Sequence, residues 1–380
     1  MRNIPITAPF FSKDEENEAR KAIRSGWIAQ GKKTLEFEGV FAGYAGSNYA
    51  IATNSCTTAL HLLLIASGIK ENDEVIVPSF THPATANAVL YLKAKPVFVD
   101  IDLETYNINA GQIKEKITRK TKAIIPVHLF GLPAEMDEII RISKKYGVKI
   151  IEDAACALGS EYKNKKIGSF NSPACFSFHP RKIITTGEGG MITTNSRKQY
   201  ELLNSLRSHG VSLSDLKHHS SKKLVFPEFT GLGYNYRITD IQSAIGIAQM
   251  KKLPFILKER RRMARYYNAG LSDINSIETP YEPPYAKHSY QTYVIRIGEK
   301  SNISRDEIMI KLMKKGISTR KGTHAVHNEP FYRNYFKYKK TDYPNSYKAD
   351  KTTVALPLYP AMSKSIQDYV ILSLRKILCG

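Results

Sequence analysis

Residues 134–155, AEMDEIIRISKKYGVKIIEDAA, join an amphipathic helix pattern to an apolar strand pattern that ends in two carboxylates. Residues 134–147 repeat apolar side chains at helical spacing, and Gly147 stands where a left-handed C-cap is favoured. Residues 148–151, VKII, are apolar apart from Lys149 and precede Glu152 and Asp153, which is typical of a parallel strand covered on both faces. The segment therefore predicts one helix–strand unit of an α/β sheet.

The same alternation of strands and helices continues in both directions along the chain. The further expected strands are 49–53, 73–79, 95–101, 122–129, 174–179 and 190–194, and the further expected helices are 57–68, 83–93 and 197–210. A long helix is expected over 239–268, kinked or interrupted by Pro254. The predicted fold class is α/β, with a large, mostly parallel sheet.

The pattern changes after the long helix. Residues 288–297 read as a strand, 304–316 as a helix and 363–378 as a closing amphipathic helix. We therefore expect two domains: a large α/β domain with an N-terminal arm over 1–250, and a linking helix with a small α+β domain over 251–380.

The charge balance is strongly basic. Against 35 Asp and Glu residues the chain carries 56 Lys and Arg residues, which gives a formal net charge of +21. These cations are spread over many segments, and no known nucleic-acid motif accompanies them. Attraction for phosphorylated small molecules is therefore favoured over nucleic-acid binding. A non-catalytic, basic nucleic-acid-binding or regulatory protein stays as the alternative of another class.

Metal, disulfide and membrane signals are weak. The four cysteines show neither CxxC nor CxxH spacing, so we expect no metal site and no disulfide framework. No run reaches the roughly 18 apolar residues of a membrane helix, and the N-terminus becomes charged before a signal-peptide core could form. A cytoplasmic enzyme is the expectation.

Lys182 stands in FSFHPRKIITTGEGG, residues 176–190, between an aromatic strand and a glycine-rich turn. A lysine that needs only solvent is more typical of a charged helix face. A Schiff-base lysine needs its amine desolvated or near another cation, and Arg181 is such a cation. The placement therefore indicates a chemical role.

Asp153 ends the strand at 148–155, and ligands of open α/β sheets bind at the carboxyl ends of strands. A buried aspartate is costly without a partner. The protonated pyridine nitrogen of pyridoxal phosphate (PLP) would be such a partner, because a carboxylate keeps that ring an electron sink. Plain helix N-capping is the alternative.

Candidate phosphate and ring contacts lie at other strand ends. Thr57 and Thr58 open an apolar helix, where hydroxyl and N–H groups bind anions, although N-capping alone explains them equally well. Ser177 offers a further hydroxyl five residues before Lys182. His82 could stack on the pyridine ring, with a core or surface role as the alternative.

In combination, several motifs resemble those of the DegT/DnrJ/EryC1/StrS family of PLP-dependent sugar aminotransferases, in the same order and spacing. They include ATNSCTTALHL, IEDAACALGS, FSFHPRKIITTGEGGMITTN and GYNYRITDIQSAIGIAQMKKL. The resemblance implies the fold type I (aspartate aminotransferase-like) architecture and a homodimer with shared active sites. It also implies transfer of an amino group, usually from L-glutamate, to a keto group on a nucleotide-linked sugar, in surface-polysaccharide or natural-product biosynthesis. A cyclitol ketone stays open as the acceptor.

The resemblance also implies roles for single residues. Those that match cofactor-binding positions of the family are Lys182 for the PLP aldehyde, Asp153 for the pyridinium, Thr57, Thr58 and Ser177 for the phosphate, His82 for stacking, and Asn235 for the cofactor phosphate of the neighbouring subunit. A dehydratase branch of the family replaces the lysine with histidine, so Lys182 argues against that branch.

Three further positions complete the expected site. Cys156 replaces the glutamine or histidine that many members place near the phenolic oxygen of the cofactor, so that contact is expected to be weaker or absent. His324 is assigned to substrate contact, with a surface loop histidine as the alternative. Arg237 is a candidate for binding a carboxylate or diphosphate. The nucleotide, the sugar and the carbon that is aminated are not specified by these motifs.

Overall fold

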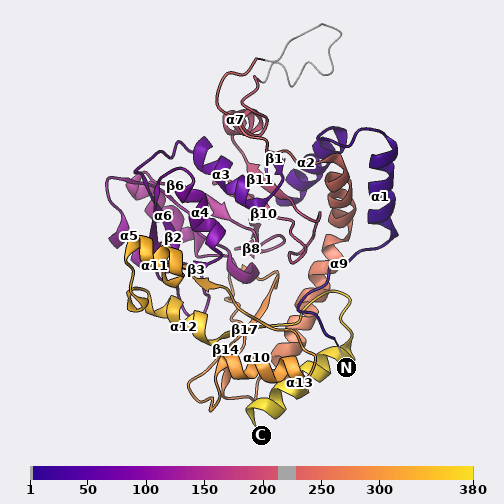
Figure 1. Ribbon diagram of the computed structural model, residues 1–380, viewed down its shortest axis with the longest axis vertical. Helices are drawn as coiled ribbons and strands as arrows, with labels where there is room; N and C mark the ends of the chain where they lie inside the picture. Colours follow the sequence, from indigo (N-terminus) through magenta and orange to yellow (C-terminus); the bar gives the residue numbers. More distant parts are fainter. Residues whose placement is uncertain (1–2, 213–227, 380) are drawn as a thin grey trace.

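A computed structural model describes residues 3–212 and 228–379. A large α/β body carries the N-terminal two thirds of the chain, and a smaller C-terminal part lies beside it, with helix α9 (Asp240–Leu271) running between them (Figure 1). Among the described residues, no helix combines the length and apolarity needed to cross a membrane.

The large body is built on one sheet. The strands follow one another in the spatial order β4 (Lys95–Val99), β2 (Glu74–Pro78), β5 (Thr121–Ile124), β6 (Lys149–Ile150) with β7 (Glu152–Asp153), β10 (Ala174–Ser177), β11 (Gly190–Thr194) and β1 (Tyr49–Thr53). A parallel bridge between Val127 and Asp153 links the two halves. Strand β11 is antiparallel to both of its neighbours, whereas the other neighbouring pairs are parallel. The predicted fold class is confirmed.

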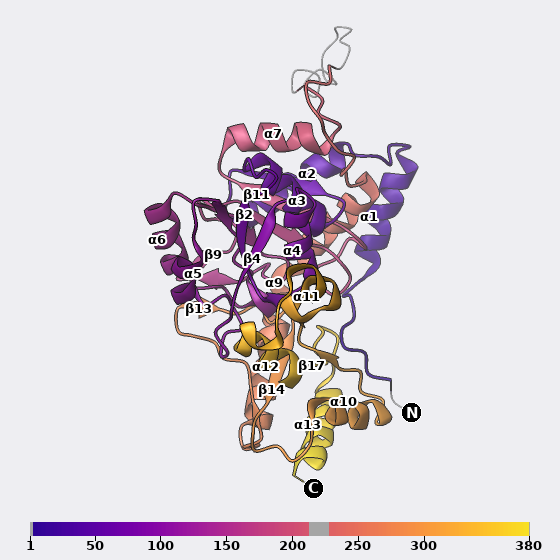
Figure 2. The ribbon, with the colours of Figure 1, turned by 60° about the vertical axis from the view of Figure 1, so that its left-hand side comes forward.

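Both faces of this sheet are buried, which explains the apolar runs in the sequence. In β2, Ile76 belongs to one hydrophobic core, whereas Val75 and Val77 belong to the core on the other face. Helices α3 (Cys56–Ala66), α4 (Pro83–Leu90) and α7 (Arg197–Arg207) cover one face, and α2 (Lys32–Ala45), α6 (Met136–Tyr146) and α9 cover the other (Figure 2). Strands covered in this way cannot alternate polar and apolar residues.

Some expected boundaries differ from the structure. The strand expected over 122–129 ends at Ile124, because Pro126 lacks an N–H for the ladder and the chain then turns into a short 3-10 helix over Leu129–Gly131. The long helix is neither interrupted nor divided at Pro254, since α9 runs through it. The expected domain boundary at residue 250 falls inside α9 and stays a prediction.

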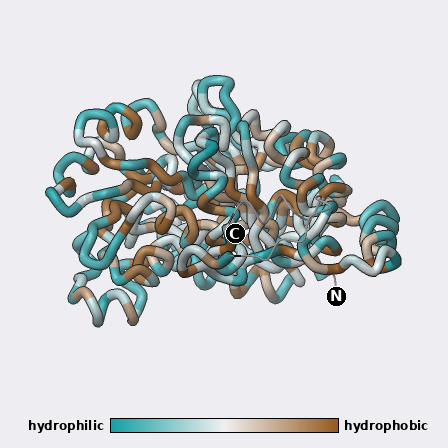
Figure 3. The backbone as a smooth tube through the Cα atoms, turned by 90° about the horizontal axis from the view of Figure 1, so that it is seen from above, coloured by the Kyte–Doolittle hydropathy of each residue, from teal (hydrophilic) through white to brown (hydrophobic). Residues whose placement is uncertain are grey.

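The C-terminal part has its own sheet and core. Its strands follow the order β12 (Ile277–Glu278), β14 (Tyr293–Ile297), β17 (Thr353–Leu356) and β15 (Arg320–Lys321), and α10 (Arg305–Lys314) and α13 (Lys364–Leu378) pack beside them. Figure 3 shows hydrophobic segments through the interior and hydrophilic ones around the rim. The other α-helices and strands within the described residues are α1 (Lys13–Arg24), β3 (Phe80–Thr81), α5 (Ala110–Lys116), β8 (Glu161–Tyr162), β9 (Lys165–Lys166), β13 (Ala286–Lys287), β16 (His324–Ala325), α11 (Pro330–Phe336) and α12 (Pro344–Thr352).

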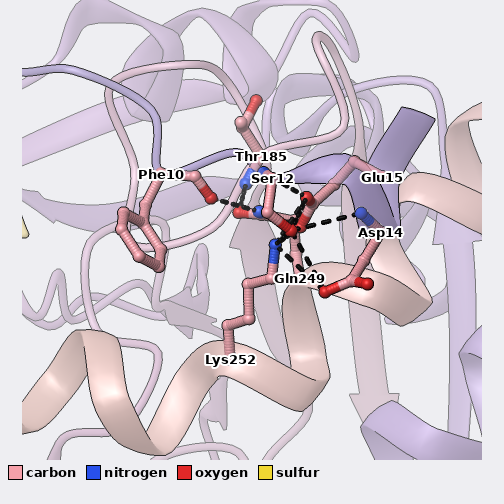
Figure 4. A network of polar contacts seen from close by, with 7 residues as sticks. All are labelled: Phe10, Ser12, Asp14, Glu15, Thr185, Gln249 and Lys252. Atoms are coloured by element: carbon pink, nitrogen blue, oxygen red, sulfur yellow. Dashed lines mark hydrogen bonds and ion pairs between the residues drawn. The ribbon is translucent and has the colours of Figure 1, made fainter. Parts of the chain in front are cut away.

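A polar network ties the N-terminal arm to the loop that carries Lys182 (Figure 4). The amide nitrogen of Gln249, on α9, donates to Glu15 at 2.7 Å and to the Phe10 carbonyl at 2.8 Å. The amide oxygen of Gln249 accepts from the backbone N–H of Thr185 at 3.4 Å. One buried glutamine therefore joins three segments that are far apart in the sequence.

Candidate active site

A cavity of about 690 Å³ lies at the carboxyl ends of β1, β2, β7 and β10, the edge at which ligands of open α/β sheets bind. Its walls include residues that follow each of these strands, among them Thr57, His82, Asp153, Cys156, Ser177 and Lys182. Residues of the C-terminal part, including Gln291, Arg320 and His324, also line it. The cavity therefore lies where the two parts of the chain meet.

Lys182 lies in the loop between β10 and β11, and its backbone N–H donates to the carbonyl of His179 at 2.8 Å. Its Nζ donates to the Sγ of Cys156 at 3.2 Å. Burial lowers the pKa of the Lys182 ammonium, but Cys156, then Cys56 and the Asp153 carboxylate, outweigh burial and leave the pKa above its ordinary value. Lys182 of the ligand-free chain is therefore cationic at neutral pH.

This outcome corrects the sequence-based expectation for Arg181. That residue is exposed, and its backbone makes its hydrogen bonds to the described residues: its N–H donates to the Nδ1 of His179 at 3.2 Å, and its carbonyl accepts from the side-chain amide of Gln291 at 2.6 Å. Negative neighbours therefore dominate the surroundings of the lysine amine, whereas the sequence had suggested that a cation would favour the neutral amine.

Asp153 ends β7 and is 5% exposed. Its Oδ2 accepts from the hydroxyl of Thr85 at 2.8 Å, and its Oδ1 accepts from the backbone N–H of Ala155 at 3.1 Å. The hydrogen bond from the Ala155 N–H is a local turn interaction, similar to the helix N-capping that was the alternative role for Asp153. Both carboxylate oxygens are held in place, and the carboxylate still borders the cavity.

The start of α3 supplies groups for an anion. Ser55 is the N-cap, accepting from the Thr58 N–H at 3.2 Å, and Ser55 and Thr57 both line the cavity. A Cβ on Gly190 would lie 2.5 Å from the Ser55 carbonyl carbon, so only glycine lets β11 approach this helix start so closely. The first N–H groups of α3 have no intrahelical acceptor and carry the positive end of the dipole.

Thr58 and Ser177 are placed differently. The Thr58 hydroxyl donates to the Oδ1 of Asn54 at 2.7 Å, and Thr58 does not belong to the cavity walls. Ser177 lines the cavity, and its Oγ also accepts from the His179 N–H at 3.4 Å. Phosphate binding by either residue stays a prediction.

His82 and His324 lie beside each other on the cavity wall. Their ring centroids are 6.2 Å apart and their rings are nearly perpendicular. His82 is exposed and is the N-cap of α4, while His324 is bonded through Nδ1 to Glu329 at 2.8 Å. The pKa of His82 is lowered because packing against the protein removes water from the charged ring, and because the charges of Lys182 and His324 repel a proton. Both histidines line the cavity, as a stacking group and a substrate contact would.

Asn235 and Arg237 lie away from the cavity. Asn235 is exposed and pairs with Ser208 in an isolated bridge, and Arg237 is partly buried. Neither residue belongs to the cavity walls of this chain. Binding of a partner's cofactor phosphate by Asn235, and of a carboxylate or diphosphate by Arg237, both stay predictions.

Comparison with known proteins identifies the chain. The DegT/DnrJ/EryC1/StrS aminotransferase family matches residues 10–375. The chain belongs to this family. It is therefore a PLP-dependent aminotransferase of fold type I.

Curated relatives match this member of the family over most of their length. GDP-perosamine synthase of Caulobacter vibrioides is 40% identical over 334 residues, which cover 87% of each chain. The spore coat polysaccharide biosynthesis protein SpsC of Bacillus subtilis is 37% identical over 380 residues, which cover 99% of this chain and 97% of the relative.

Among solved structures, the putative sugar aminotransferase Spr1654 of Streptococcus pneumoniae superposes on this aminotransferase with a TM-score of 0.93. The two chains are 29% identical, and the superposition covers 99% of each. That protein was solved in its PMP form and in its PLP form.

The residues that line the cavity of this aminotransferase fit PLP by their chemistry. Lys182 has an amine that can bond an aldehyde, and Asp153 has a carboxylate for the ring nitrogen. Ser55 and Thr57 offer hydroxyl groups for a phosphate at a helix start. An aldehyde, a ring nitrogen and a phosphate are the three polar parts of this cofactor, and each has a counterpart on the walls.

Sequence reasoning missed Thr85 and Gln291, whereas His324 of the C-terminal part was expected at the site and does line the cavity. Thr85 is 1% exposed, and its hydroxyl bonds the carboxylate of Asp153. Its position in the first turn of a helix that follows a strand was a usable signal, because that turn lies at the ligand-binding edge. Gln291 gave no such signal, since only the packing of the two parts brings it to the cavity.

Proposed function

We propose that this aminotransferase transfers an amino group from L-glutamate to a keto group on a nucleotide-linked sugar. The observation that carries the proposal is one cavity that contains the Lys182 amine, the Asp153 carboxylate and the cationic side chains of Arg181, Arg320 and Lys321. A nucleotide-linked sugar carries two negative phosphates, for which such a wall is complementary.

The cationic wall is only partly neutralised. Lys321 contacts Asp350 at 2.9 Å and Glu329 at 3.6 Å, whereas the described residues give the side chain of Arg320 no hydrogen bond or ion pair. Arg320 is therefore the better candidate for holding a phosphate, because its planar guanidinium can donate two parallel hydrogen bonds.

The residues of the chain would share the chemistry as follows. When bound, PLP supplies the electron sink that makes the Cα–H bond of the amino donor acidic. The Nζ of Lys182, released from the cofactor, would carry the proton that leaves Cα. Asp153, oriented by Thr85 and the Ala155 N–H, would keep the ring nitrogen protonated. Residues 319–324 would close the site from the side of the C-terminal part.

A homodimer forms part of the proposal. Ile23, Trp27 and Leu35 are apolar side chains with 57%, 58% and 62% exposure, and they lie close together in sequence on α1, α2 and the turn between them. That turn contacts the start of α9, since the Asp240 N–H donates to the carbonyl of Ile28 at 3.1 Å. Asn235 lies five residues before Asp240. A second copy of the chain that covers Ile23, Trp27 and Leu35 would therefore also contact the segment that carries Asn235.

The decisive experiment compares substrates and one variant. With L-glutamate as donor, we expect amination of a ketosugar linked to a nucleoside diphosphate and none of a cyclitol ketone. Lys182→Ala should stop turnover and leave no cofactor on the chain after borohydride reduction. Arg320→Gln should raise the KM for the nucleotide-linked substrate and leave the KM for glutamate unchanged. Turnover of the cyclitol ketone alone, or an active Lys182→Ala variant, would refute the proposal.

A further inference from the structure

Two thiols flank Asp153 beneath the cavity. Cys56 is the first residue of α3, and Cys175 lies on β10 in register with Asp153 on β7. The two sulfurs and a carboxylate oxygen of Asp153 all lie within 4.8 Å of one another. The three residues come from separate segments, so no motif spacing in the sequence could reveal the cluster.

These donors are of the kind that thiophilic cations take. Two cysteine sulfurs and one carboxylate oxygen form a ligand set suited to zinc or cadmium, and not to magnesium or calcium. In a tetrahedral zinc site, neighbouring ligand atoms lie roughly 3.5–3.8 Å apart, as bond lengths of about 2.3 Å to sulfur and about 2.0 Å to oxygen require. The ligand atoms, which lie within 4.8 Å of one another, would therefore have to close by about 1.3 Å at most to reach that geometry.

The cluster is accessible from one side only. Cys56 and Asp153 line the cavity, whereas Cys175 is fully buried behind them, with its Sγ 3.5 Å from the Glu152 carbonyl oxygen. A cation would enter through the cavity and take its fourth ligand, a water molecule, from the same side. The sulfur of Cys175 would be the ligand that lies farthest from the cavity.

We propose that Cys56, Asp153 and Cys175 form a binding site for a thiophilic divalent cation, and that the cation and PLP exclude each other. The exclusion rests on the proposed role of Asp153, because one carboxylate cannot serve both a metal ion and the ring nitrogen of the cofactor. Cation binding itself does not depend on that role. Such a cation would inhibit the enzyme by competing with cofactor loading.

Cadmium titration of the full-length protein, freed of PLP and kept reduced, tests the site. We expect about one tight Cd²⁺ per chain, with ultraviolet thiolate-to-cadmium absorbance, and no displacement by excess Mg²⁺. Cys56→Ser and Cys175→Ser should each weaken Cd²⁺ binding at least about tenfold, as should Asp153→Asn. Cys379→Ser removes the exposed cysteine that follows α13 and should leave binding unchanged.

Each arm has an outcome that overturns the proposal. Cation binding that persists in both Cys56→Ser and Cys175→Ser, or that is lost in Cys156→Ser instead, would place the cation elsewhere. Tight Cd²⁺ binding by Asp153→Asn would show that the carboxylate of Asp153 is not a ligand of the cation. If Cys175→Ser fails to fold, Cys56→Ser alone decides, and its far-ultraviolet circular dichroism reports its fold.

A second measurement separates the site from the proposed cofactor role. Protein preloaded with PLP should bind Cd²⁺ at least about tenfold more weakly than the cofactor-free protein, and preloaded Cd²⁺ should slow PLP uptake. Simultaneous binding of both would refute the exclusion while leaving the cation site intact. A failure of PLP to bind at all, with cadmium binding unchanged, would count against the proposed function and not against the cation site.

Discussion

The Nζ of Lys182 lies 3.2 Å from the Sγ of Cys156, so the amine of the proposed catalytic lysine has a thiol as its hydrogen-bond partner. Burial lowers the pKa of the lysine, but the Cys156 thiol, Cys56 and the charge of Asp153 together raise it by more. Covalent attachment of PLP requires the neutral amine. We therefore expect the thiol to oppose the covalent attachment of PLP at neutral pH.

Removing this thiol should shift the pH dependence of cofactor loading. In Cys156→Ala burial still lowers the pKa of Lys182, but the sulfur no longer raises it, so more neutral amine exists at a given pH. Each unit by which the pKa falls gives about tenfold more neutral amine below the midpoint. Borohydride trapping of PLP at a series of pH values should therefore show a midpoint at lower pH. Cys379→Ser is the matched control, and an unchanged midpoint in Cys156→Ala would contradict the account.

The hydroxyl of Thr85 should matter for cofactor retention. Thr85→Val keeps the shape of the side chain but removes the bond to the Oδ2 of Asp153, and an unsatisfied buried group of this kind costs about 1–3 kcal/mol. We expect the valine variant to hold PLP several-fold more weakly in equilibrium dialysis. Thr85→Ser retains the hydroxyl and should behave like the natural protein; equal weakening in both variants would assign the effect to packing.

Acid should destabilise the protein partly through Glu15. Burial raises the pKa of this carboxyl, but hydrogen bonds from Lys252, the Ser12 N–H and Gln249 outweigh it and leave the pKa below the ordinary 4.5. A depressed folded-state pKa contributes stability that is fully present above 4.5 and is lost as the pH falls through the folded-state value.

Urea unfolding at several pH values measures this contribution. Glu15→Gln should be less stable than the natural protein at neutral pH, and the difference should shrink as the pH falls below about 4.5. The exposed neighbour Glu16 provides the control, since Glu16→Gln should follow the natural curve. A constant difference between Glu15→Gln and the natural protein across the acid range would contradict the assignment.

His128 should contribute strongly to stability. Its Nδ1 accepts from the Ala134 N–H at 3.0 Å, so its Nε2 carries the proton that is donated to Glu152 at 3.1 Å, and both side chains are fully buried. His128→Leu would leave a buried carboxylate and a backbone N–H without these partners, at a cost of about 3–5 kcal/mol.

Glu152→Gln is the matched variant for His128. The amide oxygen of glutamine can still accept from the Nε2 of His128, so we expect the free energy of unfolding to fall by about 1 kcal/mol or less. Denaturant unfolding of both variants decides between a specific bond and general packing. Equal losses in His128→Leu and Glu152→Gln would favour packing.

Much of the fold follows from local signals. The apolar strands, the Gly147 C-cap and the amphipathic helices depend on neighbours within a few residues, so their types could be predicted from the sequence. Exact ends were less predictable: the strand before Leu129 ends early because Pro126 cannot donate to the ladder, a constraint that overrides the apolar run.

The candidate site was predictable where chemistry and strand ends coincide. Asp153 ends one strand and Lys182 lies in the loop after another, and parallel strands deliver their carboxyl ends to one edge. The surroundings of Lys182 were not predictable, because Cys156 lies 26 residues away and reaches the amine only through folding. For the same reason the sequence offered Arg181 as a neighbour that could influence the amine, whereas Cys156, Cys56 and Asp153 are the groups that raise its pKa.

By itself the sequence determined which segments become strands and helices, which side chains can react, and which family the chain resembles, because each of these depends on residue type and order. Only the tertiary structure decided which side chains meet at one place. The sulfurs of Cys56 and Cys175 beside Asp153, and His324 beside His82, lie together because the sheet order and the docking of the C-terminal part place them there. Such proximity arises from long-range packing, which no short stretch of sequence encodes.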